Sequence, residues 1–242
     1  MNDYTAEQAQ IKAYFIQERG YWRPWTETIL RHNPAFLKHY AAYAGYPARH
    51  GPLSPRMVEL IYIALDASAT HLFAAGLRTH LGFARKLGVT PVEVFEVFHL
   101  VACQGLNHVY DAVAILAEES GLEAGSTLSE AQRVRIQQYF HEIPPFIEQI
   151  ARMDKAYLDV LLDFLEEGGA MQSKGLAPTE RLLIEIALAA CFTGFNANML
   201  RVRIRGALNL GVTRAEILQA IQLGAHLSIH GTALGATEFE EI

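Results

Sequence analysis

The stretch LRTHLGFARKLGVTPVEV (77–94) decides the fold, because the chain repeats it as LRVRIRGALNLGVTRAEI (200–217). The shared LGVT segment has the features of a junction between two helices. Gly88 suits the left-handed position just beyond a helix end. Thr90 and Glu93 form a capping box, which starts the next helix. Each copy therefore predicts two consecutive α-helices joined by a short turn.

The repetition extends well beyond these two segments. With a shift of 123 positions, residues 53–112 align without a gap on 176–235, and 20 of the 60 pairs are identical. A weaker match continues upstream. The stretch 121–132 is rich in Gly, Ser and Thr, which is typical of a linker. We predict two homologous units, 1–122 and 123–242.

Both units are predicted to be helical. Residues 55–68 and 178–193 are apolar nearly all round, as is typical of buried helices. The segments 71–87 and 194–210 have the length of helices, and no alternating strand pattern of useful length occurs. We therefore expect an all-α fold, in which two similar helical bundles face each other within one chain as a pseudo-dimer.

The composition excludes several classes of protein. Of the 242 residues, 51% are hydrophobic and 19% are charged, and the net charge is −6. The absence of a Lys/Arg-rich tract argues against a nucleic-acid partner. The sequence also has no uninterrupted apolar run of about 20 residues, so we expect no membrane span. The first residues lack the pattern of a signal peptide, and two cysteines make no disulfide scaffold. We expect a cytoplasmic protein with a small-molecule substrate, no nucleic-acid partner and no membrane association.

The two repeated segments resemble the carboxymuconolactone decarboxylase/alkyl hydroperoxidase D family. The family pattern has an acidic residue near the start of a buried helix, an optional Cys-x-x-Cys and a histidine. A glycine and a V-T-x-x-E-like cap follow. The first unit matches with Glu59, His80 and Gly88, whereas the second has Arg203 in the histidine position. The resemblance implies two tandem alkyl hydroperoxidase D-like bundles, no metal or organic cofactor, and a homo-oligomer, either a trimer or a dimer.

The chain departs from this pattern where the hydroperoxidase branch carries its two cysteines. Phe73 and Gly76 stand there in the first unit, and Asn196 and Met199 in the second. Peroxide reduction needs a thiolate and a resolving thiol close by, so the sequence argues against a thiol peroxidase. The decarboxylase branch works without cysteine. The resemblance therefore implies a cofactor-independent lyase or isomerase, which acts on a small carboxylate, lactone or enolisable carbonyl compound.

Such chemistry needs a general acid/base, a cation for the substrate carboxylate and a dry pocket. We predict that His80 is the acid/base, since histidine titrates near neutral pH. Tyr62 or Glu59 would orient His80 or donate a proton. Arg78 would bind an anionic group. The remaining predicted substrate-binding residues would line the pocket, and they are His71, His99 and Cys103.

The two units also serve as a comparison for each other. The 123-residue shift pairs Tyr62 with Glu185 and His80 with Arg203. If the units share a fold, the second holds a Glu185–Arg203 ion pair where the first holds a Tyr62–His80 hydrogen bond. A Tyr–His pair can move a proton near neutral pH, whereas a buried ion pair holds fixed charges. We predict a reactive first unit and a structural second unit.

His226 and His230 stand four residues apart, a spacing that can bind a metal ion. The sequence offers no third ligand at a convincing spacing, so no metal site is predicted. These residues align with Cys103 and Asn107, which suggests that both helices line equivalent pockets.

Two alternatives to an enzyme of this kind stay open. A non-catalytic helical binding or assembly protein fits the missing cysteines and the divergence of the second unit. A thiol-dependent peroxidase acting through Cys103 would need a second cysteine nearby, and the sequence offers none.

Overall fold

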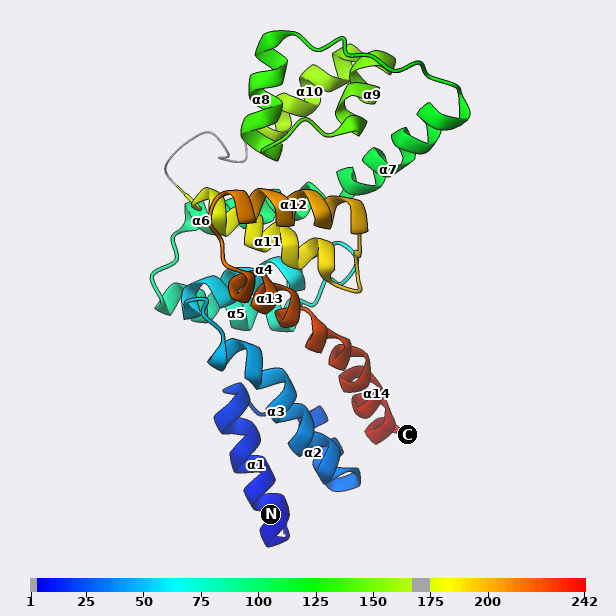
Figure 1. Cartoon of the computed structure of the whole chain (residues 1–242). Helices are drawn as coiled ribbons and strands as arrows, with labels where there is room; N and C mark the ends of the chain where they lie inside the picture. Colours follow the sequence, from blue (N-terminus) through cyan, green and yellow to red (C-terminus); the bar gives the residue numbers. More distant parts are fainter. Residues whose placement is uncertain (1–3, 167–174) are drawn as a thin grey trace.

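The computed structural model describes residues 4–166 and 175–242, which form fourteen α-helices, one short 3-10 helix and no strand (Figure 1). The helices of the first unit are α1 (Ala6–Arg19), α2 (Pro24–His32), α3 (Pro34–His50), α4 (Pro55–Ala67), α5 (Ala74–Lys86), α6 (Pro91–Ala102) and α7 (Gln104–Glu119). Those of the second unit are α8 (Glu130–Phe140), α9 (Pro145–Met153), α10 (Lys155–Leu165), α11 (Pro178–Ala190), α12 (Ala197–Asn209), α13 (Arg214–Leu223), the 3-10 helix η2 (Ala225–Ser228) and α14 (Ile229–Glu241). The prediction of an all-α fold is confirmed.

The helix boundaries repeat with the predicted shift. The first residues of α4, α5 and α6 lie 123 positions before those of α11, α12 and α13. The junction between the last two helices of each set forms for the predicted reason. Thr90 and Glu93 cap α6 reciprocally, as do the equivalent residues of α13. Gly88 has φ +81°, a conformation that glycine adopts without a Cβ penalty.

The helices form three successive layers (Figure 1). The central layer contains α4, α5 and α6 of the first unit with α11, α12 and α13 of the second, and it shares one hydrophobic core. One end layer contains α1–α3, and α14 packs on α2 there. The other end layer contains α8–α10, and α7 packs on α9. Each end layer thus holds helices of both sequence units, and the division at residue 122 stays a prediction.

Contacts across the centre of the molecule obey the same pseudo-symmetry. The carboxylate of Glu96 accepts a hydrogen bond of 2.6 Å from the backbone N–H of Leu176. At the equivalent positions, the side-chain oxygen of Gln219 accepts one of 2.7 Å from the N–H of Leu53. All four residues are buried. The two units therefore face each other as the predicted intrachain pseudo-dimer.

One helical stretch, Pro91–Glu119, is long and apolar enough to cross a membrane by length and composition alone. The chain turns at Cys103 and splits this stretch into α6 and α7. In the fold, α6 packs on α4 and α11, and α7 packs on α9.

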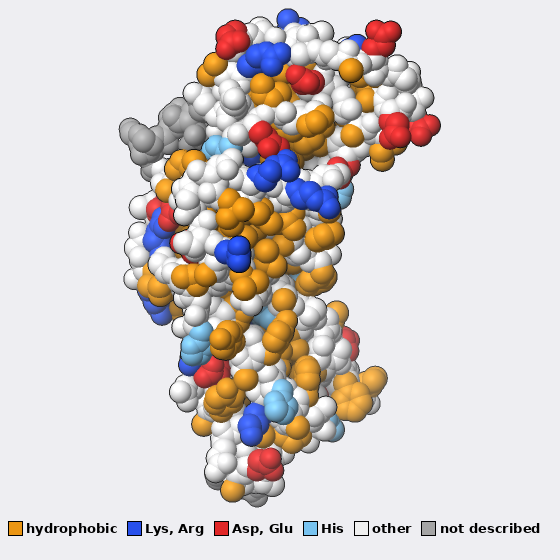
Figure 2. Space-filling view, viewed as in Figure 1, with side chains coloured by type: hydrophobic (Ala, Val, Ile, Leu, Met, Phe, Trp, Pro, Cys, Tyr) orange, Lys and Arg blue, Asp and Glu red, His pale blue; other side chains and the backbone are white. Residues whose placement is uncertain are grey.

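Large apolar side chains are nevertheless exposed on the molecule. On the face shown in Figure 2, apolar side chains gather over the central layer. Phe95 and Leu72 are each 70% exposed and Phe195 is 61% exposed. Exposed apolar patches are typical of surfaces that pair with another protein. The homo-oligomer stays a prediction, with which this surface agrees.

Candidate functional site

A cavity of about 210 Å³ lies where the central layer meets the end layer of α1–α3. Helices α1, α3, α4 and α5 of the first unit line it, together with η2 and α14 of the second unit. Helix α14 belongs to the second unit but packs on the end layer of α1–α3, and it thereby completes the wall of a cavity in the first unit. Neither cysteine lines it.

His80 and Glu59 form a close pair on this wall. The Nδ1 atom of His80 lies 2.7 Å from Oε2 of Glu59, and both side chains are more than four-fifths buried. Helices α4 and α5 pack side by side and bring the two residues together. The carboxylate accepts the hydrogen carried by Nδ1, which leaves the Nε2 atom of His80 with a free lone pair. This arrangement is typical of an oriented general base.

Tyr62 lies beside His80 but not in the predicted hydrogen bond. The two rings are in contact, with centroids 4.5 Å apart. The Tyr62 hydroxyl and Nε of Arg19 are both buried, and neither has a hydrogen-bond partner among the described residues. Burial raises the pKa of Tyr62, so its hydroxyl keeps its proton and can donate. Two unsatisfied donors at a cavity wall are the groups that a polar ligand would satisfy.

Arg19 belongs to α1 and reaches the cavity across the end layer. Its Nη1 atom donates to the backbone oxygen of Ala44 at 2.9 Å, and its Nη2 atom lies 3.2 Å from Nε2 of His226. Burial and the nearby Arg19 cation hold the pKa of His226 well below its usual value. The imidazole of His226 is therefore neutral and accepts from Arg19, and the cavity retains the positive charge of the guanidinium.

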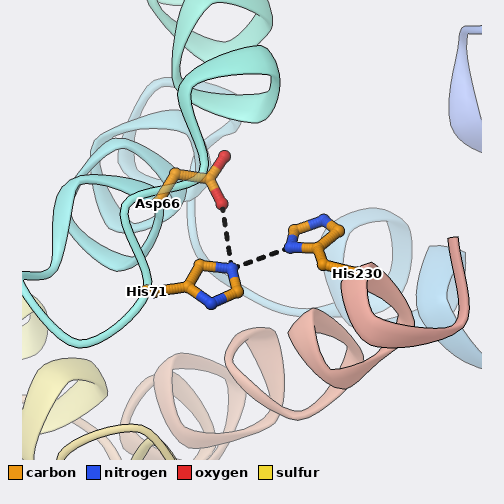
Figure 3. Close-up of side chains that lie close together, drawn as sticks. All are labelled: Asp66, His71 and His230. Atoms are coloured by element: carbon orange, nitrogen blue, oxygen red, sulfur yellow. Dashed lines mark hydrogen bonds and ion pairs between the residues drawn. The ribbon is translucent and has the colours of Figure 1, made fainter. Parts of the chain in front are cut away.

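A second polar group adjoins the same cavity and consists of Asp66, His71 and His230 (Figure 3). Asp66 and His230 line the cavity, whereas His71, which was predicted to line it, does not. The Nε2 atom of His71 lies 2.7 Å from Nδ1 of His230 and 3.9 Å from Oδ1 of Asp66. Burial raises the pKa of Asp66 to about 6 and lowers that of His230 to about 3. Burial also lowers the pKa of His71. Both imidazoles are therefore neutral at pH 7 and the carboxylate is mainly ionised.

The structure does not bring three other predicted residues to this cavity. Arg78 is exposed and does not line it. Successive helical residues are about 100° apart, so Arg78 and His80, two positions apart, point in nearly opposite directions. His99 and Cys103 lie elsewhere, with nitrogen and sulfur 3.9 Å apart, and His99 contacts the backbone oxygen of Phe164 at 2.9 Å. Burial raises the pKa of Cys103 to about 12.

Cys103 lines the equivalent place in the second unit, which is almost filled. The space there is about 20 Å³. Nη2 of Arg203 lies 2.7 Å from Oε1 of Glu185, which confirms the predicted ion pair. Met199 is buried at the position where the first unit has Gly76. Larger side chains thus occupy the volume that the first unit leaves open.

Sequence reasoning missed Arg19 and Asp66 as cavity residues. Asp66 had a usable signal, because the 123-residue shift pairs it with Ala189, which makes it a buried polar residue in one unit only. Arg19 had none, since it lies outside the well-aligned region. The alignment of His226 and His230 with Cys103 and Asn107 suggested a pocket-lining segment, and both residues line the cavity, where they contact different partners.

Comparisons with known proteins agree with this architecture. Residues 34–119, which span α3 to α7, match the model of the "Carboxymuconolactone decarboxylase family". A crystal structure from Burkholderia xenovorans LB400, provisionally described as a gamma-carboxymuconolactone decarboxylase subunit, superposes with a TM-score of 0.84. It is 26% identical, and the match covers 97% of this chain and 96% of that one. No curated protein matches the sequence. Residues 34–119 therefore match the carboxymuconolactone decarboxylase family, and the whole chain shares its fold with the Burkholderia protein.

Proposed function

We propose that the protein is a lyase or isomerase that performs decarboxylase-like acid–base chemistry in the cavity of its first unit. The observation that carries this proposal is the 2.7 Å contact between His80 and Glu59 on the wall of a cavity that also holds the Arg19 guanidinium. A base beside a buried cation is the combination that carbon-acid chemistry requires.

The substrate is a small carboxylate, lactone or enolisable carbonyl compound. The cavity volume of about 210 Å³ lies below the roughly 300–1,000 Å³ of pockets for drug-sized ligands. Arg19 and Arg23 both line the cavity and supply positive charge for an anionic group. We assign the anion-binding role to Arg19 in place of Arg78, because Arg19 has an unsatisfied donor at the cavity.

In a decarboxylation, the carbon–carboxylate bond breaks and CO₂ leaves. The electron pair of that bond remains on the organic fragment as an enolate. The Arg19 guanidinium and the Tyr62 hydroxyl stabilise the enolate oxygen. Protonated His80 then delivers the Nε2 proton to the carbon and regains a proton from solvent, while Glu59 holds the imidazolium in place. A double-bond migration would use the same base and the same oxygen-binding groups.

The second unit has a structural role in this proposal. Its equivalent cavity is closed by Arg203, Glu185 and Met199. The unit contributes to catalysis through η2 and α14, which complete the wall of the active cavity.

A proton NMR assay in D₂O tests the proposal with a panel of small lactone carboxylates and 3-oxo acids. It detects deuterium incorporation at the carbon next to a carbonyl, as well as decarboxylation. We expect turnover of at least one compound class, and a loss of about 10²–10⁴-fold in His80→Gln, as is typical for removal of a general base. Gly76→Met should block the cavity. His99→Gln is the matched control and should keep the activity within about twofold.

Two outcomes would contradict the proposal. The first is equal loss of activity in His80→Gln and His99→Gln at unchanged folding. The second is an absence of both exchange and decarboxylation across the panel, together with ligand binding that Gly76→Met abolishes. That second result would favour a binding protein.

A further inference from the structure

Asp66 is a buried carboxylate without a hydrogen bond. Asp66 is 3% exposed, and no described residue donates a hydrogen bond to its carboxylate oxygens. The nearest basic nitrogens are Nε2 of His71 at 3.9 Å and Nε2 of His80 at 4.0 Å, beyond hydrogen-bond range. Burying an ionised carboxylate costs several kcal/mol in proteins unless it is paired, hydrogen-bonded or bound to a cation. Its burial is therefore offset by no hydrogen bond, and only by these two long contacts.

Two imidazoles direct their nitrogens to the same place as this carboxylate. The close-up shows His71 and His230 turned toward each other and toward Asp66 (Figure 3). One ligand atom from each of the three residues lies within 4.8 Å of the other two. His230 is further held by a stacked contact with Phe73, whose ring centroid is 3.6 Å away. In their 2.7 Å contact one of the two facing nitrogens carries a hydrogen, and once that hydrogen moves to the other nitrogen of its ring, both facing nitrogens can offer a lone pair.

We propose that Asp66, His71 and His230 form a binding site for a divalent metal ion of the Zn²⁺ class. Zinc bonds to nitrogen and carboxylate oxygen at about 2.0–2.2 Å, so tetrahedral ligand atoms stand roughly 3.4 Å apart. The present separations of 2.7 Å, 3.9 Å and at most 4.8 Å bracket that value. Small side-chain rotations bring all three atoms to one ion. Two imidazoles and one carboxylate are ligands that suit zinc and its neighbours in the first transition series.

The local backbone leaves room for this arrangement. A Cβ atom on Gly76 would lie 2.2 Å from Oδ2 of Asp66, so any larger residue would displace the carboxylate. Leu72, next to His71, has φ +49°, a left-handed conformation that is rare for leucine. This turn directs His71 inward toward α14. Strained backbone of this kind is found mainly where a functional arrangement requires it.

The site is open to the cavity, because Asp66 and His230 also line it. Three protein ligands leave a fourth tetrahedral position for water or a substrate oxygen, as in catalytic zinc sites. A metal ion there would lie on the same wall as His80. The proposal does not rest on His80 acting as a base, and metal binding can be tested without any substrate.

The test uses tag-free full-length protein that has been dialysed against EDTA. Zn²⁺ is titrated by calorimetry, and Co²⁺ by its visible absorption, which reports four-coordinate nitrogen and oxygen ligation. We expect one ion per chain. Asp66→Asn and His71→Gln should weaken binding at least about 100-fold, since each removes a ligand. His99→Gln, which lies outside the cavity, is the matched control and should bind as the wild type does.

The wild-type cobalt spectrum keeps the test valid if a ligand variant fails to fold. The proposal is overturned if the wild type binds no stoichiometric Zn²⁺ and gives no four-coordinate cobalt spectrum. It is equally overturned if folded Asp66→Asn and His71→Gln bind as tightly as the wild type. Activity that persists in the EDTA-treated protein would leave the function proposed for His80 intact, whichever way the metal titration turns out.

Discussion

Replacing Arg203 with methionine should destabilise the protein strongly, although Arg203 lies far along the chain from the candidate site. The Arg203 side chain is 4% exposed and its Nη2 atom lies 2.7 Å from the carboxylate of Glu185, whose side chain is 14% exposed. Breaking a buried pair leaves an uncompensated charge, which costs about 3–5 kcal/mol. Because Glu185 retains some contact with solvent, we expect the lower end, about 3 kcal/mol. With about 2–4 °C per kcal/mol for chains of this size, Tm falls by about 6–12 °C.

The double variant Glu185→Leu/Arg203→Met should behave differently from either single variant. Replacing a whole buried pair by apolar side chains is often neutral, because both desolvation costs disappear together. We expect the double variant within about 1 kcal/mol of the wild type, and therefore a coupling energy above about 2 kcal/mol. Urea unfolding followed by circular dichroism measures the free energy of all four proteins.

A matched control lies two residues further along the same helix. Arg205 is 56% exposed and pairs with Glu142 at 2.7 Å, so Arg205→Met should cost less than about 1 kcal/mol. The reasoning is refuted if Arg203→Met costs no more than Arg205→Met. It is also refuted if the double variant loses the sum of the two single losses, since additivity would mean that the pair does not act as a unit.

Two further predictions follow from buried titratable groups. Because burial raises the pKa of Cys103 to about 12, iodoacetamide at pH 7.5 should label the native protein at least about tenfold more slowly than the urea-unfolded protein; rapid native labelling would contradict the buried thiol. In the folded protein the pKa of His226 is held well below its usual value. As the pH falls, His226 therefore takes up a proton in the unfolded chain near pH 6.5, while it stays neutral in the folded protein. The free energy of unfolding should fall as the pH drops below that value. His226→Gln should reduce this loss by up to about 1.4 kcal/mol per pH unit in urea titrations between pH 7 and 5; an unchanged pH slope would show that His226 does not titrate as described.

Local patterns in the sequence sufficed for the helices of the central layer. The capping box of Thr90 and Glu93 and the glycine at 88 act within a few residues of each other, so their effect does not depend on tertiary contacts. The Glu185–Arg203 contact was also predictable, because the internal repeat placed both residues in one equivalent pair of helices. The prediction that Arg78 binds the substrate did not hold for this cavity, because Arg78 shares a helix with His80 but not its face.

The make-up of the cavity was not predictable in the same way. His71 and His230 are in contact although they lie 159 positions apart and in different sequence units. That contact exists because α14 leaves its own unit and packs on the end layer of the other. An internal repeat predicts which helices resemble each other, but it does not predict which unit a terminal helix will cover. Arg19 reaches the cavity for a related reason, since it enters from α1 across the boundary between two layers.

The sequence by itself therefore determined the all-α fold, the repeated helices and the His80–Glu59 position on adjacent helices, because helix propensity, capping and periodicity are local properties of the chain. The tertiary structure alone decided which side chains share the open cavity and which fill its counterpart. Those outcomes depend on α7 and α14, each of which packs on the end layer formed mainly by the other unit. They also depend on the side-chain volumes at paired positions such as Gly76 and Met199. Burial, and with it the pKa of Asp66 and the proposed affinity for a metal ion, arises only after those helices have packed.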